Sequence, residues 1–289
     1  MKKIVLMLGI VLCCRVEYVK AACTANSDEF GNKKCLTWNP GVENNCGKGC
    51  TYTYENGTVN VVASGSSPKI SEGMFSPLYY DGGMPVEIEH IVVDGNFESI
   101  GTHAFAVAGA TISGKNGELV LNKSGWNAFG NETNVLQGDI VISDSAGTMG
   151  HGYLVNTVLD GTLIIPENIT FSSGPLRGLS VTKNGKIYCA VKNCEERLLE
   201  SCNSLPQEDA NGYDLRSRCN NSVQRIIDAG KIEAFPDGCI RMSGVGCQQC
   251  ANKNYALEYG YCYRKRYTLQ EADELTSNDN ENMIEWIFE

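Results

Sequence analysis

The chain has 289 residues, of which 42% are hydrophobic and 20% charged, and its formal net charge is −10 at pH 7. This composition is that of a folded protein and excludes an intrinsically disordered chain. The acidic balance argues against binding to a nucleic-acid backbone, which requires clustered Lys and Arg.

The first 21 residues have the pattern of a secretory signal peptide. Lys2 and Lys3 precede an apolar run from Ile4 to Cys14, and small residues end at Ala21. The run is too short to span a bilayer, and no later run is longer. A short buried strand and a lipoprotein box ending at Cys23 are the alternatives that this stretch leaves open. We expect a protein that is secreted or displayed at the cell surface, with no transmembrane segment.

Cysteine usage agrees with export. The chain has 14 cysteines, and removal of Cys13 and Cys14 with the signal would leave twelve. An even number in an oxidising compartment predicts a disulfide framework, whose connectivity the sequence does not define. The candidates are Cys23, Cys35, Cys46, Cys50, Cys189, Cys194, Cys202, Cys219, Cys239, Cys247, Cys250 and Cys262.

The spacing Cys247-Gln-Gln-Cys250 also fits two kinds of chemistry. A redox pair needs a helix N-terminus in a thioredoxin-like context, which the sequence does not show. A zinc site would need Cys239 and Cys262 as further ligands. Because export favours disulfides, we expect structural disulfides, no metal and no cofactor.

Residues 22–66 predict a cysteine-containing N-terminal β cap. Thr51–Tyr54 and Thr58–Val62 alternate in polarity, and Glu55-Asn-Gly57 between them is typical of a hairpin turn. Such a unit would cover the open end of a stack of repeats, where strand edges are otherwise exposed.

Residues 67–188 carry two recurring signals that alternate along the chain. The first is a glycine or polar residue followed by aliphatic residues, at His90–Val93, Gly117–Leu121, Gly138–Ile142, Gly161–Ile165 and Gly185–Cys189. The second is a hexamer that ends in a bulky apolar residue, at Ile70–Phe75, Ile100–Phe105, Ser124–Phe129, Met149–Leu154 and Phe171–Leu176. Self-similarity of this kind predicts a solenoid of about five irregular coils that stack to bury a continuous core.

The coil sequences resemble a known family. Leu163–Phe171 is similar to the strand and return of BspA-type leucine-rich repeats, and Ile100, Gly101, Ala104 and Phe105 match their Ile-Gly-x-x-Ala-Phe turn. The resemblance covers residues 70 to about 189. Such repeats are found on bacterial and protist surface proteins. The resemblance implies a mainly β fold, with a right-handed leucine-rich-repeat solenoid and a parallel sheet on one face.

The alternation of side chains within each strand predicts a binding face. If Leu119 and Leu121 point into the core, Val120 points outward. An exposed apolar row flanked by acids marks an interaction site, unless strand propensity alone or a covering segment explains it. The predicted face consists of Val92, Val120, Val141, Ile164 and Tyr188, flanked by Glu118 and Asp139.

Residues 189–263 predict a cysteine-rich disulfide module that includes short helices at Glu195–Glu200 and Ser222–Asp228. Within it, Cys239, Cys247, Cys250 and Cys262 resemble the disulfide knots of EGF- or furin-type modules. Residues 264–289 predict a helix that begins at Thr268 and a strand at Met283–Phe288. That strand would dock on the cysteine-rich module or pair with another chain.

These features favour non-covalent, adhesion-like recognition of a protein or glycan ligand on a cell or matrix. One alternative is a structural subunit of a cell envelope that self-associates through the C-terminal strand. Another is a polysaccharide-acting β-solenoid enzyme that would use acids such as Glu118 and Asp139. Because the sequence shows no convincing catalytic constellation, we expect a protein that is not an enzyme.

Overall fold

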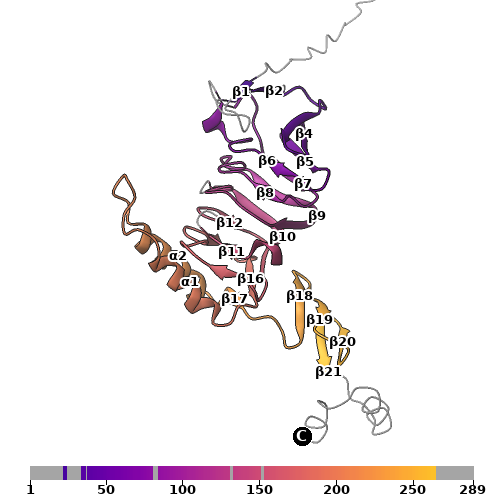
Figure 1. The fold of residues 1–289 in the computed structure, drawn as a ribbon, viewed down its shortest axis with the longest axis vertical. Helices are drawn as coiled ribbons and strands as arrows, with labels where there is room; N and C mark the ends of the chain where they lie inside the picture. The colour runs from indigo at the N-terminus through magenta and orange to yellow at the C-terminus, as the bar shows by residue number, and fades with distance from the viewer. Residues whose placement is uncertain are drawn as a thin grey trace, which may run out of the picture.

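The computed structural model describes residues 22–24, 34–36, 38–80, 84–130, 133–150 and 153–264. The fold is mainly β, with a β-solenoid of about four turns, few helices and several disulfides. The coils stack along the long axis of the molecule, from β4 and β5 near one end to β16 and β17 (Figure 1).

One large sheet runs through the stack in the order β17-β16-β13-β10-β9-β7-β5-β4-β3, and β12 and β15 extend it beside β10. Its strands are β3 (Asn44–Gly47), β4 (Cys50–Glu55), β5 (Thr58–Ala63), β7 (His90–Asp94), β9 (Thr111–Leu121), β10 (Val135–Ile142), β12 (Val158–Leu159), β13 (Thr162–Ile165), β15 (Ser180–Val181), β16 (Lys186–Cys189) and β17 (Ile232–Glu233). The pairs β3–β4 and β4–β5 are antiparallel, and every later pair in the sheet is parallel.

The number of coils is smaller than the sequence predicts. Only four stretches contain both an aliphatic strand and a following hexamer. The first hexamer, at Ile70–Phe75, follows the hairpin strand β5, and the last strand, β16, leads into a helix. The prediction of about five coils is therefore wrong by one, because a helix replaces the last hexamer.

The predicted hairpin is confirmed. β4 and β5 pair from Cys50–Ala63 to Glu55–Thr58, and Asn56 and Gly57 in the turn both have positive φ. This backbone geometry is the one that Asn-Gly turns favour. β5 then pairs in parallel with β7, so the hairpin joins the solenoid without a break in the sheet.

The glycine before each aliphatic segment has a steric reason. Gly117 and Gly138 have positive φ. A Cβ at Gly138 would collide with the carbonyl oxygen of Gly117, and one at Gly161 would collide with that of Gly138. Neighbouring coils therefore approach so closely at this corner that only glycine fits.

The hexamers form short strands and fill the core. The short strands pair as β6 (Lys69–Ile70) with β8 (Ser99–Ile100), and β11 (Thr148–Met149) with β14 (Thr170–Phe171). The last residues of three successive hexamers, Phe75, Phe105 and Phe129, are fully buried and stacked, with ring centroids 5.7 and 5.5 Å apart. This stack of rings confirms that the hexamers face the interior of the coils.

Two helices, α1 (Cys194–Asn203) and α2 (Leu215–Asp228), cover the hexamer side of the last coil. In an earlier coil the backbone N–H of Gly73 donates to the carbonyl of Thr102 in the next coil, at 2.8 Å. In the last coil the N–H of Gly174 donates instead to the carbonyl of Ser201 in α1, at 3.1 Å. The helices therefore satisfy backbone groups that a further coil would otherwise bind. Both predicted helices are confirmed, and both are longer than predicted.

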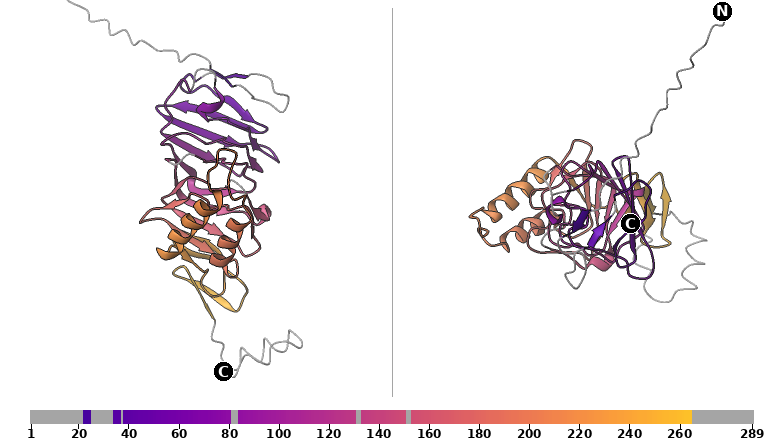
Figure 2. Two further views of the ribbon diagram at one scale, coloured as in Figure 1. Left: turned by 90° about the vertical axis from the view of Figure 1, so that its left-hand side faces the viewer. Right: turned by 90° about the horizontal axis from the view of Figure 1, so that it is seen from above.

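The C-terminal hairpins lie on the opposite side of the solenoid from the helices (Figure 2). They are β18 (Cys239–Ser243) with β19 (Gly246–Cys250), and β20 (Tyr255–Glu258) with β21 (Tyr261–Arg264). Below, these residues 239–264 are called the hairpin module. Residues 232–238 connect the module to the end of the solenoid, where β17 pairs with β16.

The disulfide framework is confirmed for ten cysteines. The bonds are Cys46–Cys50, Cys189–Cys194, Cys202–Cys219, Cys239–Cys247 and Cys250–Cys262. Cys23 in β1 (Ala22–Thr24) and Cys35 in β2 (Lys34–Leu36) are register partners of each other. The side chains of these two strands are not described.

Three sequence predictions concern residues that the structure does not describe. The signal peptide, the helix from Thr268 and the strand at Met283–Phe288 all lie outside the described ranges. Within those ranges, neither helix has the length and apolar character needed to cross a membrane.

Candidate binding surface

The predicted phase of the strands is correct. Leu119, Leu121, Leu163 and Ile165 are at most 2% exposed and belong to the solenoid core, whereas Val120 is half-buried. Alternate residues of these strands therefore line an outer face of the sheet.

The outer row is continuous over four strands. Val120, Val141, Ile164 and Tyr188 are successive register partners in β9, β10, β13 and β16. Val92 does not join them, because its partner in β9 is Ser113. β10 pairs with β9 in two stretches separated by a register shift between Gln137 and Asp139. The predicted outer row is therefore not continuous: Val92 is separated from the row formed by Val120, Val141, Ile164 and Tyr188.

The hairpin module covers Val141, Ile164 and Tyr188 of this four-residue row, and Val120 lies outside the covered cluster. Ile164 is only 3% exposed and packs with Cys239, Met242 and Cys247 in a hydrophobic cluster separate from the solenoid core. Val141 and Tyr188 are partly buried against the same cluster. The prediction that Ile164 belongs to an exposed face is wrong, because a segment of the same chain covers it. We call Val141, Ile164 and Tyr188 the covered half.

A hydrogen bond from the module fixes the position of this cover. The backbone N–H of Gly244, in the turn between β18 and β19, lies 2.9 Å from each carboxylate oxygen of Asp139. A Cβ at Gly244 would lie 2.5 Å from Asp139 Oδ1 and 2.9 Å from Thr162 Oγ1, so the turn touches the sheet closely. Asp139 was predicted to flank a ligand site, and in the structure it binds the chain's own hairpin.

At the far edge of the covered half, a salt bridge joins β16 to β17. Lys186 Nζ lies 2.9 Å from Glu233 Oε1 and 5.2 Å from the centre of the Tyr188 ring. The hydrogen bond with Glu233 raises the pKa of Lys186. These contacts link Tyr188, at the edge of the covered half, to β17 through Lys186.

The rest of the face remains accessible. Val62 is 40% exposed, Val92 and Val120 are half-buried, and His90 and Glu118 are exposed. These five residues, which we call the open half, lie on β5, β7 and β9. Glu118 is the register partner of Asp139, so the open half begins next to the docked turn.

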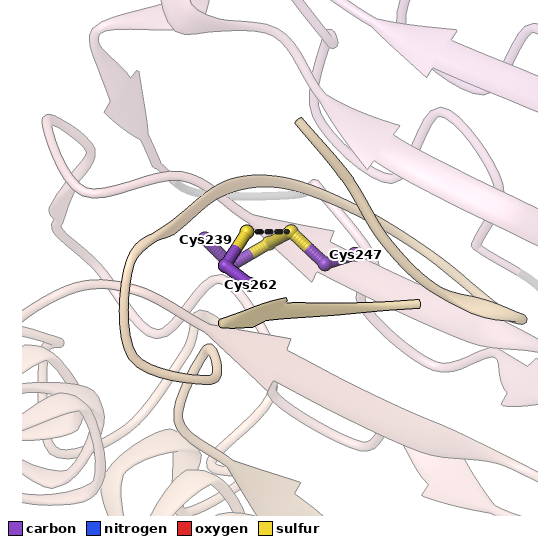
Figure 3. A group of neighbouring side chains, drawn as sticks. All are labelled: Cys239, Cys247 and Cys262. Carbon is purple, nitrogen blue, oxygen red and sulfur yellow. Dashed lines mark hydrogen bonds between the residues drawn. A yellow bond between two sulfur atoms is a disulfide. The ribbon is translucent and has the colours of Figure 1, made fainter. Parts of the chain in front are cut away.

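Three cysteine sulfurs of the hairpin module lie close together. Cys239, Cys247 and Cys262 place their sulfurs within 4.8 Å of one another, and Cys247 Sγ lies 3.3 Å from Cys262 Sγ (Figure 3). Zinc binds cysteine as the thiolate. Since Cys239 is bonded to Cys247 and Cys250 to Cys262, no sulfur of this cluster is a thiolate in the structure.

A second surface, which the sequence analysis missed, lies along the hexamers. The Tyr79 hydroxyl donates to Glu72 Oε1 at 2.9 Å and lies 3.1 Å from His103 Nδ1. The His103 ring in turn lies 5.1 Å from the Trp126 ring, and Trp126 is 45% exposed. Burial and the bond to Glu72 raise the pKa of Tyr79 to about 12, and burial lowers the pKa of His103.

The sequence signal for this surface is a histidine, His103, at the fourth hexamer position, which Gly73, Asn127 and Gly174 occupy in other hexamers. His103 has a φ of +53°, at the hexamer position where Gly73, Asn127 and Gly174 also have positive φ. Positive φ is uncommon in residues other than glycine, so a histidine at a position that holds Gly or Asn in other hexamers draws attention to the row.

An open groove of about 790 Å³ lies beside the connector of the module. It is lined by the Cys189–Cys194 loop, by the start of α1 and by Ile232 to Cys239. Its charged side chains, Glu167, Lys192, Glu195, Glu196 and Asp237, are mostly acidic. The groove separates the end of the solenoid from the chain that carries the cover.

Comparison with known proteins yields no match: no family model fits the chain, and no curated protein or solved structure is significantly similar to it.

Proposed function

We propose that this protein is a secreted or surface-displayed binding module of the BspA-type leucine-rich-repeat kind. It would recognise a protein, cell-surface or matrix ligand without covalent chemistry. The alternation of strand and hexamer supports the repeat assignment, and the disulfides are consistent with an extracellular location.

The observation that carries the proposal is the contrast within the outer face. The chain covers Val141, Ile164 and Tyr188 with its own hairpins, and leaves Val62, Val92 and Val120 accessible. The open half combines apolar side chains with His90 and Glu118. Non-obligate protein interfaces likewise combine apolar with polar side chains.

The proposal is tested with the full-length protein secreted from a eukaryotic host. The variant with both Val92→Glu and Val120→Glu is expected to bind cells and immobilised matrix proteins about tenfold less tightly or worse, as loss of interface anchors predicts. Leu78→Glu is the matched control, because Leu78 is 80% exposed and lies outside the sheet. Unchanged binding by a folded double variant would exclude the open half as the ligand site.

A second candidate is a subunit that assembles with copies of itself, and one observation favours it. Tyr259, Tyr261 and Tyr263 on the second hairpin are 94%, 56% and 51% exposed. Exposed tyrosines are enriched at protein interfaces. Light scattering over a range of concentrations tests this candidate. A mass that rises with concentration and returns to the monomer value in Tyr259→Ser/Tyr261→Ser would support assembly.

A polysaccharide-acting enzyme gains no support from the acids on the face. Glu118 and Asp139 are register partners, as predicted for neighbouring coils. The Asp139 carboxylate, however, accepts the N–H of Gly244 on both oxygens. This pairing gives Asp139 a structural role.

A further inference from the structure

The two disulfides of the hairpin module lie side by side. Cys239–Cys247 belongs to the first hairpin, and Cys250–Cys262 joins the first hairpin to the second. The nearest sulfurs of the two bonds, those of Cys247 and Cys262, are 3.3 Å apart. A thiolate formed on either of these two residues would therefore already lie next to the sulfur of the other.

The two bonds differ in their exposure. Cys247 is 1% exposed and Cys239 is 9% exposed, whereas Cys250 and Cys262 are half-buried. Thiol–disulfide exchange depends on access to the sulfur that is attacked. A thiol from solution would reach Cys250–Cys262 first, and would reach the inner bond only through Cys262.

A second connectivity fits the same four residues. Cys239 and Cys250 are directly opposite each other in the register of β18 and β19. Opposite residues of an antiparallel pair have Cα atoms within the span that a disulfide bridges. Cys247 and Cys262 are already in sulfur contact. The pairs Cys239–Cys250 and Cys247–Cys262 therefore need only small movements of the hairpins.

We propose that the hairpin module is a thiol–disulfide exchange site that takes a low-molecular-weight thiol as its co-reactant and interconverts these two connectivities. The thiolate attacks Cys250 Sγ, forms a mixed disulfide there and releases Cys262 as a thiolate. Cys262 attacks Cys247 Sγ, which forms Cys247–Cys262 and releases Cys239 as a thiolate. Cys239 then attacks Cys250 Sγ, which forms Cys239–Cys250 and returns the thiolate to solution.

The cycle consumes no oxidant or reductant, because the same thiolate enters at the first step and leaves at the last. Each step breaks one S–S bond and forms one. Since Cys239 and Cys247 also pack against Ile164, the exchange takes place within the contact that seats the module on the sheet. The inference does not depend on which ligand the open half binds.

The test uses the full-length oxidised protein and catalytic amounts of glutathione. Samples are quenched with acid, alkylated and digested with trypsin, and the disulfides are mapped by mass spectrometry. Trypsin leaves Cys247 and Cys250 together in residues 242–253, so both connectivities give one linked species of identical mass. Backbone fragmentation between Gln248 and Gln249 distinguishes them.

We expect Cys239–Cys250 and Cys247–Cys262 to appear together and to reach about a tenth or more of the module's disulfides, since each step replaces one S–S bond with another. The internal control is Cys202–Cys219, which is fully buried and should stay intact. Persistence of only the original pairs would overturn the proposal. Open thiols without the new pairs, or scrambling that includes Cys202–Cys219, would also overturn it.

A variant keeps the test independent of the equilibrium between the two forms. Cys239→Ser with Cys250→Ser leaves Cys247 and Cys262, which should oxidise to a single disulfide between residues 242–253 and 254–264. If both remain free thiols after air oxidation in a protein whose circular dichroism is native, the sulfur contact does not support exchange.

Discussion

The covered and open halves of the outer face are made of the same kinds of residue, yet only one half is available to a ligand. Val141 and Ile164 in the covered half match Val92 and Val120 in the open half in type and in strand phase. What separates them is a turn 105 residues further along the chain, where Gly244 meets Asp139. Exposure of a strand face is therefore a property of its tertiary neighbours.

The cover and the sheet depend on each other. A module of about 26 residues cannot bury enough apolar surface to be stable alone. It therefore relies on disulfides and on apolar contacts with the sheet of the solenoid. Its apolar contacts are Met242, Cys239 and Cys247, and they surround Ile164 of the solenoid. The contact shields the apolar side chains of the covered half from water, and it gives the module a small hydrophobic core.

The largest effect is expected from a charge under the cover. Ile164→Glu places a carboxylate in an apolar contact without a partner, which should cost on the order of 3 kcal/mol and release the module. Urea unfolding and limited proteolysis between residues 232 and 239 measure the two effects. The matched change Val120→Glu in the open half should cost about 1 kcal/mol or less. Equal losses in the two variants would contradict the division of the face.

A methyl group at the contact should have the next largest effect. In Gly244→Ala the new Cβ would lie 2.5 Å from Asp139 Oδ1, so the turn must move away from the sheet. We expect a loss of about 2 kcal/mol, typical of a steric clash at a packed contact. Asp139→Ala should reduce the cost of the glycine change, and a double-mutant cycle measures this coupling. Additive effects would show that the two residues do not interact.

Removing the Asp139 carboxylate, which accepts the Gly244 hydrogen bond, should lower the free energy of unfolding by less than the Gly244→Ala change does. Asp139→Ala loses a charge-assisted hydrogen bond to the Gly244 N–H, which we expect to lower the free energy of unfolding by about 1.5 kcal/mol. Glu118→Ala is the matched control, since Glu118 is the exposed register partner on the open side. Its effect should stay within about 0.5 kcal/mol. Thermal unfolding of both variants at one pH provides the comparison.

The smallest effect is expected at the edge of the covered half. The Lys186–Glu233 salt bridge is about 40% exposed on both sides, so Glu233→Gln should cost less than about 1 kcal/mol. High salt should remove most of the difference between this variant and the native protein. A loss of stability as large as that of Ile164→Glu would mean that the pairing of β17 with β16, rather than the contact at Ile164, holds the hairpin module on the sheet.

Local patterns predicted much of the fold. Asn56 and Gly57 predicted the first hairpin because few other residues accept its backbone angles. The spacing of aliphatic segments and hexamers predicted stacked coils, although it overestimated their number by one. The end of α2 at Asp228 is also readable in the sequence, because Gly230, which follows the C-cap and has positive φ, is the residue type that favours this conformation.

Of the candidate site, the sequence predicted which residues share a face and missed which of them are accessible. The register shift that separates Val92 from Val120 depends on how β9 bends between two neighbours, and the sequence of β9 alone does not specify it. The row of Tyr79, His103 and Trp126 was missed because Tyr79 lies outside the hexamers and the other two occupy different hexamer positions.

The sequence by itself determined the inward and outward phase of each strand, because alternation and glycine corners follow from local backbone geometry. The number of cysteines also predicted a disulfide framework, which the structure shows for ten of them. Only the tertiary structure decided which cysteines pair and which half of the face is covered. Both depend on contacts between segments far apart in sequence, such as Gly244 with Asp139, and no local pattern encodes such contacts.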